Sequence, residues 1–308
     1  MNRNTKAAAV SIASNAFLLV LKLIVGLITN SISVISAAAD SLNDLAASII
    51  AFFSVRESAK PADVEHPYGH GKIENMSMVV QAILIFAAAV YVIREAVQKI
   101  LIPRPIESPI LAVSVMGTTA ILDFFVSRYL ISVANETDSA AIRADAYHLT
   151  TDVWTSIGVL IGLTLVYITD IQIFDPILAL IIAAAIIRVA YQLSRDAIYI
   201  LLDVRLPEAE LRELEHIVMA TPRIVGFHQF RTRRAGPCRE VDYHLIVPAN
   251  MQVVEAHSIA ECIESKMRES FPNTTVVTHI EPDTNEIITE PNTAVKDNQL
   301  EDETSHSP

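Results

Sequence analysis

Residues 141–168 read AIRADAYHLTTDVWTSIGVLIGLTLVYI, and this stretch sets the class of fold. Its 28 residues exceed the roughly 20 that a helix needs to cross the hydrocarbon core of a bilayer, and no charged residue follows Asp152. His148 and Asp152 stand four apart in its first half, so a helix presents both side chains on one face. Asp145 lies one turn earlier. The stretch predicts a membrane-spanning helix that carries titratable groups inside the bilayer.

Similar apolar runs fill the first two-thirds of the chain. Together with 141–168, the predicted spans are residues 7–27, 32–53, 76–97, 110–131 and 173–193. Hydrophobic residues make up 52% of the chain and charged residues 19%, whereas a soluble domain carries about 25% charged residues. We therefore predict an α-helical membrane protein with six transmembrane helices in a domain of residues 1–204.

Lys and Arg predict the orientation of these helices, because short cytosolic loops carry an excess of both residues. With the N-terminus inside, nine Lys and Arg residues flank the inner ends, against Arg94, Lys99 and Arg104 around one outer loop. Both termini are therefore expected in the cytosol. The first apolar run has no A-x-A-like cleavage site, so we expect a retained helix rather than a signal peptide.

The last third of the chain is different in character. It predicts helices over 207–220 and 253–271 and strands over 224–232, 240–247 and 274–281. This α-β-β-α-β order is typical of a small ferredoxin-like α+β domain, which we place in the cytosol over residues 205–284. Residues 285–308 hold six acidic residues against Lys296 and lack apolar periodicity, which predicts a disordered acidic tail.

The net charge and the cysteine content indicate which partners and which cellular compartment suit the chain. The net charge is −12, which argues against a nucleic-acid partner, since such a partner requires a basic face. Cys238 and Cys262 are the two cysteines of the chain; they imply no disulfide framework and suit a reducing cytosol. Compact loops and the lack of a signal peptide predict a prokaryotic inner (cell) membrane.

A second pair of titratable residues lies on the predicted span 32–53. Asp40 and Asp44 stand four apart, and each carboxylate near the bilayer centre costs at least about 2.5 kcal/mol on insertion scales. A bound cation would offset this cost and the mutual repulsion. With His148 and Asp152 the pair supplies three carboxylates and one imidazole, a set that can close a tetrahedral zinc site and also suits other divalent transition metals. Alternatively, the carboxylates lie near a wetted helix end, and His148 is a hydrogen-bonded core histidine.

Two further groups of candidate metal ligands lie outside the spans. The loop after the second span offers Asp63, His66 and His70, a His-x-x-x-His with a nearby carboxylate; the alternative is a solvated polar loop. Candidate ligands in the soluble domain share their placement on or beside the predicted strands and second helix. They are His228, His244, His257, His279 and Glu281. Ordinary surface histidines are the alternative for this set.

Three motifs together carry a family resemblance. They are AADSLNDLAAS at 38–48, HPYGHGKIE at 66–74 and ADAYHLTTD at 144–152. With the six spans and the α+β domain, the chain resembles the cation diffusion facilitator family of metal–proton antiporters over residues 1 to about 285. The combined pattern is specific, whereas either i, i+4 pair alone would be weak.

The resemblance implies roles for the candidate residues. It makes Asp40, Asp44, His148 and Asp152 the transport site, and Asp63, His66 and His70 the site of a second ion. It makes the histidines of the soluble domain a regulatory zinc site and implies a homodimer through that domain and the membrane edge. Ile280 and Glu281 stand where family members often carry a polar residue and Asp, which leaves one or two regulatory ions open.

The expected function is secondary active efflux of a divalent transition metal from the cytosol in exchange for protons, without enzyme activity or an organic cofactor. The set of three Asp and one His resembles the zinc-type members, which often also take ferrous iron or cadmium. An intramembrane metallohydrolase would need a spare general base, and no H-E-x-x-H occurs. A membrane-tethered metal sensor would have no need for carboxylates in the second span. A channel differs from an antiporter by the absence of proton counterflow.

Overall fold

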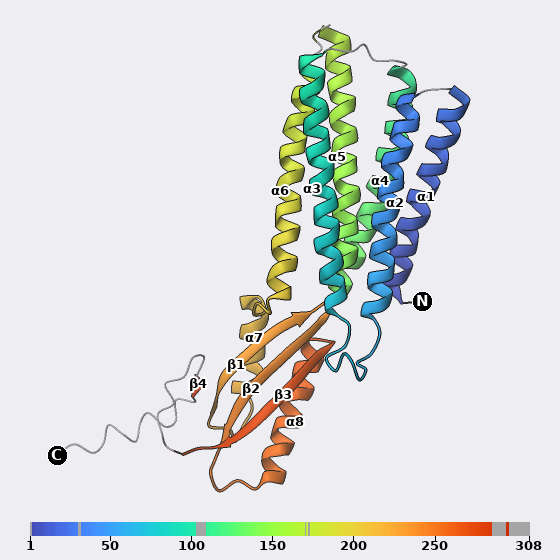
Figure 1. The fold of residues 1–308 in the computed structure, drawn as a ribbon. Coiled ribbons are helices and arrows are strands. Elements are labelled where there is room, and N and C mark those ends of the chain that lie inside the picture. Colours follow the sequence, from blue (N-terminus) through green and yellow to red (C-terminus); the bar gives the residue numbers. More distant parts are fainter. Residues whose placement is uncertain are drawn as a thin grey trace, which may run out of the picture. The chain divides into compact units, whose positions relative to one another are not determined.

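The computed structural model describes residues 2–29, 32–102, 109–169, 171, 173–284 and 294–295. The chain forms two compact units, Met1–Leu201 and Leu202–Pro308. The first is helical, and the second combines helices with a β-sheet (Figure 1).

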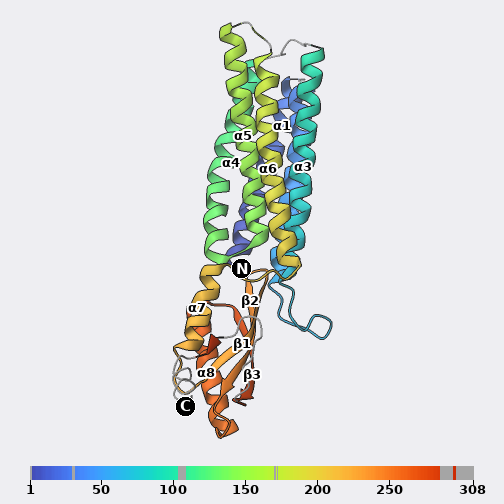
Figure 2. The same ribbon diagram turned by 90° about the vertical axis from the view of Figure 1, so that its left-hand side faces the viewer.

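Six long helices form the first unit and lie side by side in a bundle (Figures 1 and 2). They are α1 (Arg3–Thr29), α2 (Ile32–Ser58), α3 (Lys72–Leu101), α4 (Pro109–Thr137), α5 (Ala140–Thr169) and α6 (Phe174–Leu201). The closest pairings are α1 with α2, α3 with α6 and α4 with α5. Each predicted span corresponds to one of these helices.

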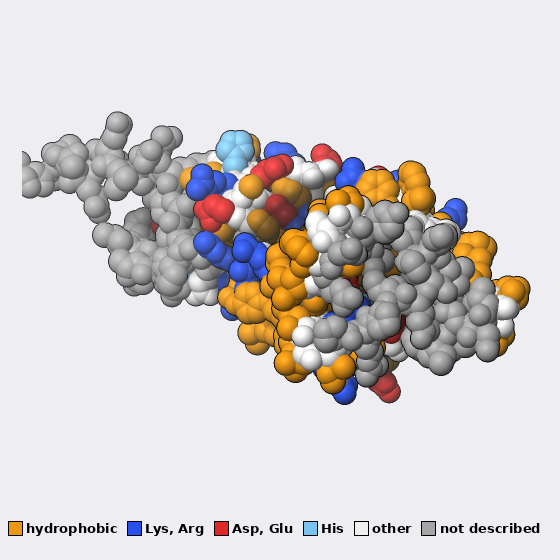
Figure 3. Space-filling model, turned by 90° about the horizontal axis from the view of Figure 1, so that it is seen from above, with side chains coloured by type: hydrophobic (Ala, Val, Ile, Leu, Met, Phe, Trp, Pro, Cys, Tyr) orange, Lys and Arg blue, Asp and Glu red, His pale blue; other side chains and the backbone are white. Residues whose placement is uncertain are grey.

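Five helices of the described chain are long and apolar enough to cross a membrane, namely α1, α3, α4, α5 and α6. Large apolar side chains such as Phe17, Ile28 and Phe125 stay more than half exposed on the outside of the unit, as a lipid-facing surface requires. Hydrophobic side chains also line the rim of the helical unit in Figure 3. The sixth predicted span, α2, is 27 residues long but is not among these five, so its crossing of the bilayer stays a prediction.

Small residues bring the helices of this unit close together. Buried alanines of α3 and α6 form much of one apolar cluster, and small side chains allow close backbone approach inside membranes. At Gly162 of α5 an added Cβ would lie 2.8 Å from Oδ1 and 3.0 Å from Cα of Asp175 on α6. The α5–α6 packing therefore depends on the missing side chain at Gly162.

A buried carboxylate joins three helices at one end of the bundle. Glu74, near the start of α3, is 1% exposed. Its Oε1 accepts a hydrogen bond from Ser58 Oγ at the end of α2 (2.8 Å), and its Oε2 accepts one from Ser139 Oγ (2.6 Å). The backbone N–H of Ala141 also donates to Oε2 at 3.4 Å, so Glu74 satisfies donors at the start of α5. We refer to this contact as the Glu74 junction.

The second unit is a four-stranded sheet with two helices packed on it. Its elements are α7 (Glu208–Met219), β1 (Gly226–Ala235), β2 (Cys238–Val247), α8 (Val253–Ser270), β3 (Thr274–Pro282) and β4 (Ala294–Val295). The strand order is β3-β2-β1-β4, with β1 and β2 antiparallel and β2 and β3 parallel. Apolar residues at helical spacing on α7 and α8, including Leu214 and Ile263, share one core with Phe227 and Tyr243 of the sheet.

The predicted α-β-β-α-β order is confirmed by this unit. The short strand β4, which pairs antiparallel with Gly226 and Phe227 of β1, comes from the segment predicted as a disordered tail. The rest of that tail, residues 285–293 and 296–308, lies outside the described residues.

Candidate metal sites

The membrane unit brings together Asp44 of α2 with His148 and Asp152 of α5, here named the transmembrane triad. His148 Nε2 lies 3.3 Å from Asp44 Oδ1 and 4.0 Å from Asp152 Oδ2. The side chains are 8%, 24% and 31% exposed for His148, Asp44 and Asp152. The i, i+4 spacing on α5 and the packing of α2 against α5 produce this convergence.

Two atoms of the triad are buried without a hydrogen-bond partner among the described residues. They are Nε2 of His148 and Oδ2 of Asp152. Buried polar atoms rarely stay unpaired, because their desolvation is costly. The imidazole nitrogen of His148 and the carboxylate oxygens of Asp44 and Asp152 form a donor set of the kind that binds a divalent transition metal.

Asp40 is the one predicted ligand of this set that the structure does not bring into the triad. It is exposed, and it lies one helical turn from Asp44, about 6 Å along α2 at 1.5 Å per residue. Asp40 and Asp44 share a face of α2, but at different depths in the bundle.

A polar network lies next to the triad and holds α1, α2 and α5 in register. Ser48 Oγ on α2 contacts Ser11 Oγ at 2.8 Å, accepts from Asn15 Nδ2 at 2.7 Å and donates to Asp145 Oδ1 at 3.2 Å. Asn15 Nδ2 also lies 3.3 Å from the backbone oxygen of Asp44. The network therefore positions the α2 backbone at a triad residue. Sequence reasoning missed Ser11 and Asn15, although their i, i+4 spacing within an apolar span was a usable signal.

The loop between α2 and α3 brings together Asp63, His66 and His70. Asp63 Oδ1 lies 3.3 Å from His66 Nδ1, and Asp63 Oδ2 lies 3.4 Å from His70 Nε2. The backbone N–H of His66 donates to the Asp63 carboxylate at 2.7 Å, and this bond is the main cause of the lowered pKa of Asp63. Gly69 adopts a positive φ of 81° that permits the tight turn between the two histidines.

The sheet of the second unit brings together His228, His244 and Glu281, here named the sheet cluster. His228 of β1 and His244 of β2 are cross-strand partners. Glu281 Oε2 lies 2.8 Å from His228 Nε2, and Glu281 Oε1 lies 2.9 Å from His244 Nδ1. Burial tends to raise the pKa of Glu281, but the hydrogen bonds to the two imidazoles outweigh burial and lower it. Two imidazoles and a bridging carboxylate can hold a transition metal.

The remaining two predicted ligands of this unit lie differently. His279 is the register partner of His244 on β3, with ring centroids 4.6 Å apart, and its Nε2 is 3.4 Å from Glu281 Oε1. Its side chain is 62% exposed, at the margin of the sheet cluster. His257 lies on α8 with its side chain 67% exposed, and it pairs with Glu261 at 3.5 Å rather than with the cluster.

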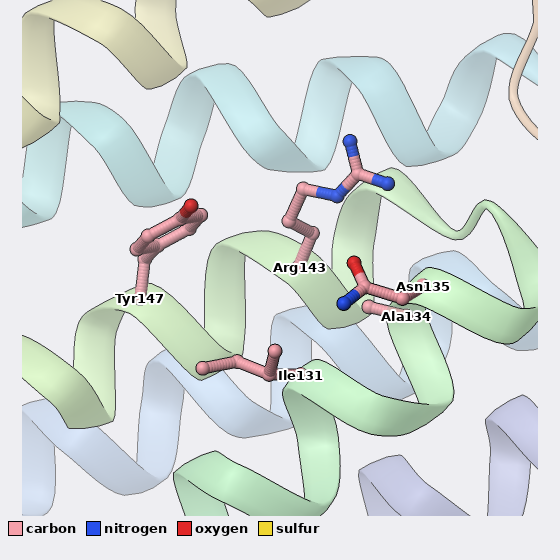
Figure 4. A pocket seen from close by; sticks show the side chains of 5 residues that line it. All are labelled: Ile131, Ala134, Asn135, Arg143 and Tyr147. Atoms are coloured by element: carbon pink, nitrogen blue, oxygen red, sulfur yellow. The ribbon is translucent and has the colours of Figure 1, made fainter.

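A separate pocket opens beside the turn from α4 to α5. Its volume is about 190 Å³, and Ile131, Ala134, Asn135, Arg143 and Tyr147 line it (Figure 4). None of these side chains belongs to the three groups of candidate ligands. The candidate metal ligands of the described residues therefore lie in the side-chain clusters and not in this pocket.

Comparison with known proteins shows the family of the chain. Residues 8–202 match the model of the cation efflux transmembrane domain, and residues 206–283 match that of the cation efflux protein cytoplasmic domain. A solved zinc-form structure of the transporter CzrB has a TM-score of 0.26 and 29% identity, and the match covers 27% of this chain and 97% of that one.

Curated relatives match along most of their length. A transporter of Synechocystis sp. is 34% identical over 89% of this chain and 89% of its own. The cation-efflux pump FieF of Cronobacter sakazakii is 33% identical over 90% of this chain and 92% of its own, and FieF of Salmonella schwarzengrund is 34% identical over the same shares. These relatives are transporters and not enzymes. The chain therefore belongs to the cation diffusion facilitator family of cation efflux transporters.

Proposed function

We propose that this protein exports a divalent transition metal from the cytosol in exchange for protons, with zinc as the preferred ion and ferrous iron and cadmium as further substrates. The observation that carries this proposal is the transmembrane triad, because Asp44, His148 and Asp152 converge from two helices inside the membrane unit. Asp40 completes the set of transport residues, as the next carboxylate along α2.

The donor atoms support the choice of ion. The imidazole of His148 favours zinc and iron over magnesium and calcium, which prefer oxygen ligands alone. Carboxylates from Asp44 and Asp152 balance the charge of a divalent ion, so the ion enters a low-dielectric region without a large uncompensated charge.

Proton exchange follows from competition for the same atoms. Carboxylates and imidazole bind metal when deprotonated, so loading releases protons and unloading takes them up. Relative motion of α2 and α5 against the rest of the bundle would open the triad first to one side and then to the other. Inward proton flow then drives metal export, and the membrane potential contributes about 2.3 kcal/mol per charge per 100 mV.

The other two clusters have supporting roles in this proposal. Asp63, His66 and His70 bind a second ion in the α2–α3 loop. The sheet cluster, extended by His279, binds zinc in the cytosol, tightens a homodimer and raises transport when metal is abundant. Both termini lie in the cytosol, and the membrane is a prokaryotic inner membrane.

The test is metal flux into proteoliposomes that contain a metal-sensitive dye. Zinc, ferrous iron, manganese and cadmium are supplied in turn, with and without an imposed pH gradient. We expect gradient-dependent zinc flux in the native protein and at least a hundredfold less in Asp44→Ala. Flux that ignores the pH gradient would identify a channel instead, and absence of flux for every ion would favour a sensor.

A further inference from the structure

A buried carboxylate that belongs to none of the candidate metal clusters lies on α4, on a helix face that packs against α5. Asp123 is 2% exposed, and its Oδ1 is buried with no hydrogen-bond partner among the described residues. It shares a helix face with Val126, Ser127 and Leu130, which are also buried. An ionisable side chain at this depth is costly unless it has a partner or a function.

The depth of Asp123 follows from helix geometry. The helices α4 and α5 are antiparallel neighbours joined by a tight turn, and Asp123 precedes Thr137, the end of α4, by 14 residues. At a rise of 1.5 Å per residue it lies about 21 Å from that turn, whereas Asp152 lies about 18 Å and His148 about 12 Å along α5. Asp123 therefore lies slightly deeper in the bundle than His148 and Asp152, on the side away from the Glu74 junction, and at about the depth of Asp44.

Charged groups on α1, α2 and α5 lie near enough to Asp123 to interact with it electrostatically. They are Lys22 of α1, Asp44 of α2, and His148 and Asp152 of α5. Lys22 of α1 is itself only 8% exposed, and its Nζ donates to Ser41 Oγ at 2.6 Å. Three carboxylates and one ammonium group give this region a formal charge of −2, which one divalent cation neutralises.

We propose that Asp123 is a transit ligand: together with Asp152 it binds the divalent metal ion at a second, deeper position after the ion has left His148. Asp152 is shared by the two positions, so the ion never loses all its anionic ligands at once. The next carboxylate beyond this level is Asp40, one turn past Asp44 on α2. This inference rests on the proposed transport function and adds a step to it.

The test separates metal binding from metal movement. For the flux assay, Asp123→Asn, Asp123→Glu and the neighbouring buried Ser127→Ala are made in the native full-length protein. For zinc binding, the same variants also carry His66→Ala and His228→Ala, so that the affinity reports the membrane unit. Zinc affinity is measured by competition with a chelator in detergent, and the maximal zinc flux is measured in proteoliposomes.

We expect Asp123→Asn to bind zinc within threefold of its parent and to lose about tenfold or more in maximal flux, since the lost interaction is made along the path and not in the loaded triad. Asp123→Glu should recover part of the flux, and Ser127→Ala should stay within twofold of the parent. Unchanged flux in Asp123→Asn would overturn the inference, as would a tenfold loss of zinc affinity or an equal loss of flux in Ser127→Ala. If the native protein itself moves no metal, the proposed transport function fails instead.

Discussion

The sheet cluster allows a quantitative prediction for one substitution, Glu281→Gln. The change keeps the size of the side chain and removes its charge. Glu281 is within 2.9 Å of both His228 and His244, so it would supply the anionic ligand of any ion held there. Its lowered pKa indicates that the surroundings already favour the ionised form.

The magnitude follows from ligand loss. Changing an outer-shell partner of a metal ligand weakens binding by about 10- to 100-fold, or about 1.4 to 2.7 kcal/mol, and loss of the ligand charge itself should cost at least as much. With free zinc at about 100 times the dissociation constant of the native site, zinc stabilises the folded unit by about 2.7 kcal/mol. This stabilisation falls to about 1.4 kcal/mol if the variant binds tenfold more weakly, and to about 0.4 kcal/mol at a hundredfold.

The assay is zinc competition with a chelator, using full-length protein in an Asp44→Ala background that silences the transmembrane triad. Glu269→Gln is the matched control, because Glu269 is exposed on α8 and belongs to none of the candidate metal clusters. Zinc affinity of Glu281→Gln within twofold of its parent would refute the reasoning. An equal loss in Glu269→Gln would show a general charge effect instead.

Three further predictions concern packing, titration and the loop. Gly162→Ala should lower the melting temperature, because the new Cβ is forced against Asp175 and the free energy of unfolding falls by about 1–3 kcal/mol. The control Gly117→Ala, whose Cβ meets no atom within 4 Å, should be neutral or stabilising. Equal shifts in melting temperature for the two variants would contradict this. Burial raises the pKa of Tyr243 to about 12. The neutral phenol should therefore contribute its full stability below pH 10, and the free energy of unfolding should fall by about 2 kcal/mol as the pH rises from 10 towards 12. Unfolding of Tyr243→Phe, measured between pH 9 and 12, should lack this loss. Asp63→Asn should weaken zinc binding to the α2–α3 loop by about tenfold, measured by titration, and unchanged affinity would remove the loop site.

Much of the architecture could be predicted because membrane-spanning helices, amphipathic helices and strands each have a distinct pattern of apolar residues. Long apolar runs predicted α1 and α3–α6, and the change to short amphipathic segments predicted the α-β-β-α-β unit. The strand β4 was missed because two residues paired with β1 leave no periodic signal.

The candidate sites were partly predictable for a related reason. Helical spacing brought His148 and Asp152 to one face, but it could not show that Asp40 lies a turn too far along α2 to join them. Spacing says nothing of a lone residue, so Asp123 was missed, although its place as the single acidic residue of the predicted span 110–131 was a usable signal. On α8, His257 was grouped by residue type with histidines of the sheet, although its exposed side chain lies with Glu261 instead.

The Glu74 junction has a mechanical consequence. Because it clamps the end of α2 to the start of α5, a tilt between these helices has its fulcrum at Ser58 and Ser139. Asp44 lies 14 residues from Ser58 along α2, about 21 Å away at 1.5 Å per residue. A tilt of about 10° would displace it by nearly 4 Å, more than the 3.3 Å that separates Asp44 from His148. A small rotation could thus pull the triad apart while the clamp at its base stays closed.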